Sequence, residues 1–248
     1  MNRSESPNAS DAPAIDVWER TKPHSGSVQA MNRRLFMQLL VFDCEPATGC
    51  AAVVSQLEKQ LQKAKAPFVL YEDLNHPLGL GLLTWSEDPN DFITRVRPCW
   101  TAELAPKLRL RPDFTMFGRT YATGYEPDLK YWLLDRPVET VTNSSWPWAV
   151  WYPLRRSGAF ARLEPREQGS ILREHAEIGK AYGAQDLAHD VRLMSHGLDA
   201  RDNEFVIGLV GKELHPLSHV VQAMRSTRQT AEFIVQMGPF FVGRAIAG

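Results

Sequence analysis

The order of predicted strands and helices constrains the fold of this chain more than any other feature. In the first half, apolar runs of strand length alternate with stretches whose apolar residues recur at helical spacing. The predicted strands lie at 35–42, 68–71, 78–85 and 114–121, and the predicted helices at 51–64 and 91–96. The resulting order, β-α-β-β-α-β, is the split βαβ unit of ferredoxin-like folds.

The second half repeats this order without repeating the residues. Its predicted strands lie at 149–154, 191–194, 205–210 and 240–243, and its predicted helices at 164–182 and 214–224. Two such units side by side can join their antiparallel sheets, with the helices covering the outside. We therefore predict an α+β fold in which two fused ferredoxin-like units form a dimeric α+β barrel.

Composition and element order divide the chain into four segments. Residues 1–30 carry Ser, Asn, Pro and mixed charges without periodicity, which predicts a disordered tail. Residues 31–123 form the N-terminal ferredoxin-like half and residues 149–248 the C-terminal half. The connector at 124–148 is rich in Pro, Asn, Ser and Trp, and its length makes it a candidate functional loop.

Charge and composition argue against several classes of function. A net charge of −1 and a pI near 6.7 give no excess of positive charge of the kind that binds nucleic acid or an anionic membrane. No apolar run approaches the roughly 20 residues needed to span a bilayer. The N-terminus lacks an apolar segment typical of a secretory signal. Cys44, Cys50 and Cys99 have no CxxC spacing, so we expect reduced thiols in a cytoplasmic protein.

Motifs of the common nucleotide, hydrolase and zinc sites are missing from the sequence. There is no GxGxxG, no Walker loop and no GxSxG. His215 and His219 are four residues apart on a predicted helix, but no glutamate follows His215 as in HExxH. These classes of site therefore have no support.

A phenol, two guanidiniums and an imidazole are concentrated in one predicted strand-to-helix unit. Tyr152, Arg155 and Arg156 belong to the strand segment, and His175 follows within the long helix, 23 residues after the tyrosine. The neighbours of His175 on its helix face are Ile171, Leu172, Ile178 and Gly179. An apolar face with one imidazole and one glycine can lie flat against a porphyrin while the imidazole reaches the iron.

Each of these residues also has a plainer interpretation. His175 could be a core histidine bonded to a backbone carbonyl. Tyr152 could simply pack its ring and hydrogen-bond its hydroxyl. Arg155 and Arg156 suit bidentate recognition of carboxylates such as heme propionates, but arginines near a strand end are often only solvated.

The segments at 151–157, 163–167 and 172–175 resemble the chlorite dismutase superfamily, and coproheme decarboxylases most of all. The later stretch from Asp202 to Gly243 resembles the closing strand-helix-strand of the same family. The resemblance covers roughly residues 149 to 244, and the first half matches only by architecture. It implies a double ferredoxin-like barrel, commonly pentameric, with heme in the C-terminal half.

The resemblance also implies roles for individual residues. His175 would be the proximal iron ligand and Tyr152 the redox-active tyrosine. Arg156, and more weakly Arg155, would contact a heme propionate. Thr230 would supply a propionate-binding hydroxyl. The separation of tyrosine and histidine is the family's own spacing and is the most specific part of the match.

Two positions depart from family members. A gapless count from His175 puts Ala188 where chlorite dismutases hold a distal arginine, which argues against chlorite chemistry. The same kind of count puts Asp135 where actinobacterial decarboxylases hold a distal histidine. The base that activates peroxide is therefore unassigned, with Asp135, His189 or a water as candidates.

The function implied by the resemblance is hydrogen-peroxide-dependent oxidative decarboxylation. The propionates of coproheme III (Fe-coproporphyrin III) would become vinyl groups, giving heme b, so the cofactor would also be the substrate. A chlorite dismutase-like or peroxidase-like heme b enzyme is one alternative, and a non-catalytic heme-binding protein is another. A third is a barrel protein without heme. The expected partners are coproheme or heme, peroxide, and further copies of the chain in a homo-oligomer.

Overall fold

The computed structural model describes residues 14–23 and 28–248. Its strands are β1 (Glu19–Arg20), β2 (Ala30–Met31), β3 (Phe36–Cys44), β4 (Phe68–Asp73), β5 (Gly79–Ser86), β6 (Leu108–Leu110), β7 (Met116–Arg119), β8 (Trp148–Arg156), β9 (His189–Met194), β10 (Phe205–Gly211), β11 (Ile234–Met237) and β12 (Phe241–Ala247). Its α-helices are α1 (Cys50–Lys63), α2 (Arg136–Thr142), α3 (Gly158–Ala161), α4 (Pro165–Ala184) and α5 (Leu214–Arg225). Short 3₁₀ or π turns are η1 (Phe92–Val96), η2 (Arg97–Cys99), η3 (Ala105–Lys107), η4 (Pro112–Phe114), η5 (Tyr131–Asp135) and η6 (Gln229–Phe233).

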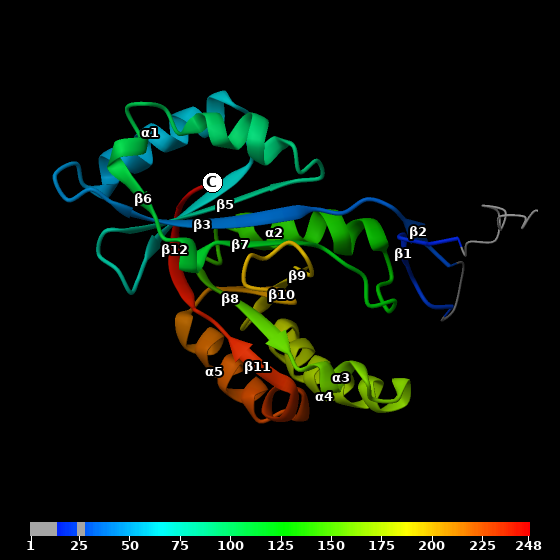
Figure 1. The fold of residues 1–248 in the computed structure, drawn as a ribbon. Coiled ribbons are helices and arrows are strands. Elements are labelled where there is room, and N and C mark those ends of the chain that lie inside the picture. Colours follow the sequence, from blue (N-terminus) through cyan, green and yellow to red (C-terminus); the bar gives the residue numbers. More distant parts are fainter. Residues whose placement is uncertain (1–13, 24–27) are drawn as a thin grey trace, which may run out of the picture.

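The large sheet closes on itself as a barrel. Its strands follow the order β10-β9-β7-β3-β5-β4-β12-β8, and β8 pairs again with β10. β6 and β11 add to this ring by pairing with β3 and β8. Figure 1 shows α1 outside one wall of the barrel and α4 with α5 outside the opposite wall. The α+β prediction of two ferredoxin-like halves joined in one barrel is confirmed.

Side chains alternate between the two faces of each barrel strand, as the period of two requires. On β8, Ala149 and Trp151 point into the barrel core, whereas Val150, Tyr152 and Leu154 join a separate apolar cluster outside. Trp151 is fully buried and lies against Gly208 of β10, where an added Cβ would stand 2.6 Å from the indole ring. The glycine therefore makes room for the indole.

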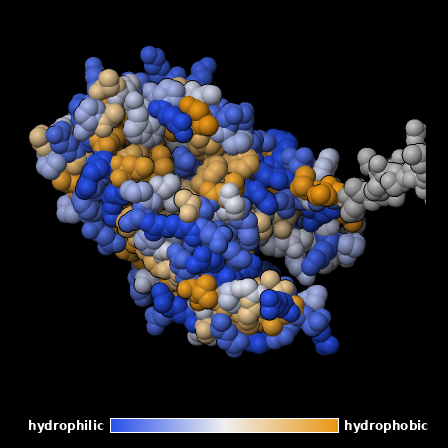
Figure 2. Space-filling model, in the orientation of Figure 1, coloured by the Kyte–Doolittle hydropathy of each residue, from blue (hydrophilic) through white to orange (hydrophobic). Residues whose placement is uncertain are grey.

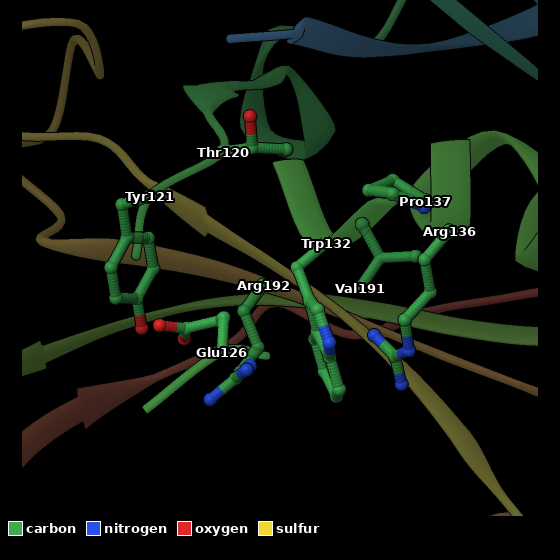
Figure 3. A pocket seen from close by; sticks show the side chains of 8 residues that line it. All are labelled: Thr120, Tyr121, Glu126, Trp132, Arg136, Pro137, Val191 and Arg192. Carbon is green, nitrogen blue, oxygen red and sulfur yellow. The ribbon is translucent and has the colours of Figure 1, made fainter. Parts of the chain in front are cut away.

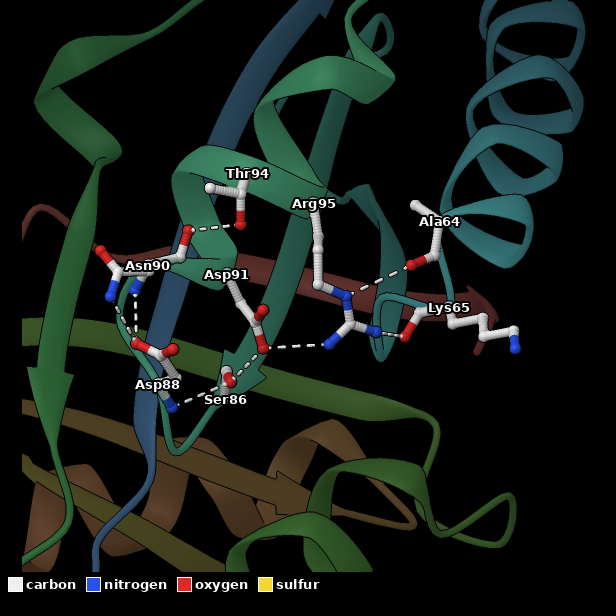
Figure 4. Close-up of polar contacts among 8 residues, drawn as sticks. All are labelled: Ala64, Lys65, Ser86, Asp88, Asn90, Asp91, Thr94 and Arg95. Carbon is white, nitrogen blue, oxygen red and sulfur yellow. Dashed lines mark hydrogen bonds and ion pairs between the residues drawn. The ribbon is translucent and has the colours of Figure 1, made fainter.

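The N-terminal half packs its helix directly onto the barrel wall. Val53, Leu57 and Leu61 of α1 are fully buried in the cluster between helix and sheet. The end of α1 is fixed by Arg95 of η1, whose guanidinium donates to the backbone carbonyls of Ala64 and Lys65 (Figure 4). These bonds satisfy carbonyls that a helix end leaves without partners.

The C-terminal half covers the opposite wall with α4 and α5. Leu217 and Val220 of α5 are buried against the sheet. The much longer α4, with 20 residues, contributes only Ile171 as a fully buried side chain. α4 contacts α5, β9 and η6. It therefore reaches the barrel mainly at β9.

Most predicted elements agree with the structure, and after residue 31 four α-helices or strands were not predicted. The short strands β6 and β11 carry little pattern of their own, and α3 is a single turn. α2, preceded by η5, falls inside the segment that was expected to be an irregular connector. Pro137 at its start is compatible with a helix because the first turn needs no backbone donor there.

The structure differs from the predicted tail where residues before 31 are described. β1 and β2 pair as a two-stranded ribbon, held by a bond from the Arg119 guanidinium to Glu19. Three apolar side chains just before β1 are exposed: Ile15, Val17 and Trp18. Figure 2 shows hydrophobic surface beside the grey trace. The predicted tail over 1–13 lies outside the described residues. Within the described chain, every helix is too short or too polar to span a bilayer.

Candidate functional site

Strand register places Tyr152 and a second polar residue in one row on the outer face of the C-terminal wall. Tyr152 pairs with Ile207 of β10, and Ile207 pairs with Arg192 of β9. Neighbouring strands lie about 4.8 Å apart, so the Tyr152 and Arg192 backbones are separated by roughly 10 Å. Because all three residues share a face, the phenol and the guanidinium both project toward the α4 side.

The imidazole of His175 on α4 is oriented by Thr227, which follows α5. His175 Nδ1 lies 3.4 Å from Thr227 Oγ1, and Thr227 is itself buried. The Thr227 hydroxyl donates to the carbonyl of Met224 at 2.8 Å. Its oxygen can therefore accept a hydrogen bond from His175 Nδ1, and in that tautomer the Nε2 lone pair is available to a metal.

The surroundings of His175 keep its imidazole neutral. Burial lowers the pKa of His175 below its ordinary value, and the positive charge of Arg192 lowers it further. Asp190 and Glu174 oppose this shift without reversing it. A metal binds only the neutral ring, so the low pKa favours ligation near neutral pH.

Tyr152 is buried, and its phenol stays protonated. Its ring stacks on Phe240 with centroids 4.5 Å apart. Burial raises the pKa of Tyr152, Asp190 raises it further, and Arg225 at the end of α5 opposes both. Oxidation of this phenol would therefore require release of its proton. Arg225 is close enough to influence the phenol, and no pattern in the sequence singled it out.

Asp190 and Arg192 are the main residues that sequence reasoning missed. Both act on the pKa of His175, and they are joined by an ion pair of 3.0 Å. Ala188, which the gapless count put at the distal position, is instead buried in the turn before β9. The absence of an arginine at position 188 stays an argument against chlorite chemistry, and the guanidinium whose charge reaches His175 is that of Arg192 on β9.

The two predicted propionate arginines point to different faces of β8. Arg156 shares the outer face with Tyr152, stacks between the rings of Phe160 and Phe205 at 4.4 and 4.7 Å, and donates to Glu204 at 3.1 Å. Arg155 lies on the other face and donates to Gln236 across the strand pair. Arg156 is therefore the better placed of the two.

Thr230 lies on the His175 side of the site. It belongs to η6, and its Oγ1 is 3.3 Å from Thr227 Oγ1, the group that orients His175. The structure thus brings Thr230 and His175 together through Thr227. The predicted role of Thr230 at a propionate stays a prediction.

Asp135 and His189 are engaged elsewhere. Asp135 forms an ion pair with Lys130, and its charge acts on the exposed pair Arg33 and Glu87. His189 lies on the barrel-facing side of β9. Its ring stacks on that of Trp146 with centroids 3.6 Å apart, and its Nε2 lies 2.7 Å from Asp186 Oδ1. His189 therefore does not share the outer face of Tyr152, and Asp135 lies in η5, outside the sheet.

The residues between α4 and the sheet fit a flat apolar group with acidic substituents. Many side chains there are only partly buried although they join one apolar cluster, among them Ile178, Ile207, Met224, Met237 and Phe240. A Cβ added to Gly179 of α4 would meet only Met224, at 3.6 Å. His175 would hold an iron through Nε2, and Arg156 and Arg225 would face carboxylates. An iron porphyrin matches this set of donors.

The barrel and its helices resemble solved structures of a heme-binding protein and of chlorite dismutases. A heme-binding protein from Thermus thermophilus matches with a TM-score of 0.67 and 15% identity, over 86% of this chain and 92% of that one. The chlorite dismutase from Candidatus Nitrospira defluvii in complex with imidazole matches with a TM-score of 0.68 and 14% identity, over 87% and 92%. A mutant of that enzyme in complex with cyanide gives 0.68 and 15%, over 87% and 92%. At these identities the similarity establishes the fold.

Sequence comparison identifies the family. No curated protein is significantly similar to the chain. The family described as chlorite dismutase matches residues 120–246, just over half of the 248 residues, and this stretch contains Tyr152, His175 and Arg192. The chain is a member of the chlorite dismutase family.

Proposed function

We propose that this protein binds an iron porphyrin through His175 and uses hydrogen peroxide to decarboxylate the propionates of coproheme III, giving heme b. The observation that carries this proposal is the placement of Tyr152. Its phenol lies on the outer wall opposite the helix of His175, and the positive charge of Arg225 reaches it. An oxidisable group beside a carboxylate clamp is what removal of a propionate carboxyl requires.

When bound, the iron porphyrin supplies the oxidising equivalents taken from peroxide. Tyr152 loses an electron and its proton, and the phenoxyl then takes a hydrogen atom from the propionate carbon next to the ring. Arg156 and Arg225 hold the carboxylate in place while its carbon–carbon bond breaks. For each propionate, one peroxide and one proton are consumed, and one vinyl group, one carbon dioxide and two waters are formed.

The test is mass spectrometry of the protein titrated with iron coproporphyrin III and peroxide. The wild-type protein should give stepwise loss of two carboxyl groups. Tyr152→Phe should still bind coproheme, because the ring packing on Phe240 is kept, but both propionates should remain intact. Vinyl formation at the wild-type rate in this variant would reject Tyr152 as the oxidant.

A second candidate function is a chlorite dismutase-like or peroxidase-like reaction of heme b. The observation that favours it is Arg192, a guanidinium beside His175 and therefore suited to an anionic oxidant. Steady oxygen release from chlorite without bleaching of the cofactor would support this function over decarboxylation. Tight heme b binding without either activity would instead support a heme-binding protein that is not an enzyme. Cytoplasmic location and homopentameric assembly stay predictions.

A further inference from the structure

Asp190 places a carboxylate on the outer face of β9, and the proposed reaction assigns no role to it. Asp190 pairs with Leu209 of β10, which pairs with Val150 of β8, one row from Tyr152. Asp190 and Arg192 therefore project to the same side of the sheet as Tyr152. A group bound to His175 would present its opposite face to this wall, since the helix and the sheet lie on its two sides.

Two guanidiniums hold the Asp190 carboxylate in a fixed position. Arg136 of α2 donates to Asp190 Oδ1 at 2.7 Å and also to the Asp190 backbone carbonyl at 2.8 Å. Arg192 Nε lies 3.0 Å from Asp190 Oδ2. Arg136 is itself supported by the ring of Trp132, 4.6 Å from its guanidinium carbon. The carboxylate thus has an orientation set by three elements.

The Asp190 carboxylate is both accessible and charged. Its side chain is 39% exposed, and burial is the largest influence on the pKa of its carboxyl. Burial raises that pKa, but Arg192 and Arg136 outweigh burial, so the carboxylate is ionised. His175 and Tyr152 both sense its charge.

We propose that Asp190 accepts the proton of hydrogen peroxide as peroxide enters the site opposite His175. In this step an O–H bond of peroxide breaks, an O–H bond forms on the carboxylate, and a hydroperoxide anion remains next to Arg192. The inference rests on the proposed function, because peroxide must be a substrate. It assigns to Asp190 the role for which Asp135 and His189 are badly placed.

A small cavity behind the ion pairs offers a route for the proton. The cavity has a volume of about 10 Å³, near the minimum for one water, and is lined by Tyr121, Glu126, Arg136 and Arg192 among others. Figure 3 shows the Tyr121 hydroxyl and the Glu126 carboxylate beside Arg192. A water there would have polar partners on several sides, and it would connect the Asp190 region to a second carboxylate.

The test compares two iron ligands, of which only one loses a proton on binding. Hydrogen cyanide must lose its proton as it binds iron, whereas neutral imidazole binds without losing one. Wild-type protein and Asp190→Asn are loaded with hemin, and association of each ligand is followed by stopped-flow absorbance near neutral pH. A general base contributes about 100-fold or more to such a rate, so cyanide association should slow by that factor in the variant. Imidazole association should not change.

Two further variants complete the design. Asp190→Glu keeps a carboxylate but moves it, so its rate of cyanide association should lie between those of wild type and Asp190→Asn. This variant also provides a comparison with wild type if Asp190→Asn takes up hemin weakly. Asp186→Asn, the same kind of change in the preceding turn at a carboxylate 65% exposed, should leave both rates unchanged.

Three results would overturn the inference or its basis. Equal cyanide rates in all variants would show that Asp190 takes no proton. Parallel slowing of cyanide and imidazole would show that Asp190 only shapes the site. Absence of a Soret band in wild-type protein after hemin addition would reject the proposed function itself, which is distinguishable from the other two results.

Discussion

The two halves of the barrel share one architecture but cover their walls differently. In the N-terminal half, α1 buries Val53, Leu57 and Leu61 completely within 14 residues. In the C-terminal half, α4 is 20 residues long and completely buries only Ile171. Helix α1 therefore covers its side of the core completely, whereas α4 leaves the apolar side chains beneath it partly accessible.

The difference between the two walls shows which side of the barrel is suited to binding a ligand. Direct helix-to-sheet packing stabilises the N-terminal wall, where the side chains of α1 that face the sheet are fully buried. The C-terminal wall combines apolar, partly accessible side chains with a neutral imidazole, a buried phenol and guanidiniums. Protein interiors are normally close-packed, so an under-covered apolar face of this kind indicates a bound partner molecule.

The largest expected effect is on packing in the N-terminal half. Leu57→Ala should lower the free energy of unfolding by about 2–5 kcal/mol, because it creates a cavity at a fully buried site. The matched change Ile178→Ala in α4 should cost only about 1 kcal/mol in the ligand-free protein, since that side chain is partly accessible. Urea unfolding measures both values. Equal losses would mean that α4 packs as tightly as α1.

The second effect is on ligand binding in the C-terminal half. His175→Ala should weaken hemin affinity by about 100-fold or more, or roughly 2.7 kcal/mol, because it removes the iron–nitrogen bond. Titration of the Soret absorbance measures the affinity. The stability of the ligand-free protein should change little, since among the described residues the imidazole has one hydrogen-bond partner, Thr227, at 3.4 Å. An unchanged affinity and spectrum would remove His175 as the iron ligand.

The smallest effect concerns the pH dependence of stability. The pKa of His175 is lower in the folded protein than in the unfolded chain, so the unfolded chain binds the proton more readily. Ligand-free wild type should therefore lose stability relative to His175→Asn as pH falls below about 6.5. Urea unfolding at pH 7.5 and pH 5 measures this difference, with His76→Asn in the N-terminal half as the control. Parallel pH curves for wild type and His175→Asn would contradict the buried, neutral imidazole.

Local patterns in the sequence predicted much of the fold. The apolar runs that became β3, β5 and β10, and the helical periodicity of α1 and α5, depend on near neighbours in the chain. β6 and α2 were not predicted. β6 has three residues, and α2 lies in a segment with the composition of a loop.

The candidate site was predictable only in part. Tyr152, Arg156 and His175 were found because they form a compact motif. Asp190 and Arg192 alternate with apolar residues on β9, which is also the pattern of an ordinary strand with one solvated face. The sequence did not reveal that a helix covers this face.

By itself, the sequence determined the order of elements, the two-fold repetition of that order, and the residue types that can hold a porphyrin. The tertiary structure decided which of these residues lie close together. Barrel closure through β8 and β10 brought Tyr152 into one row with Arg192, and the turn after α4 set the position of that arginine relative to His175. Such contacts depend on strand register and helix placement between residues far apart in the chain, and short-range periodicity carries no information about either.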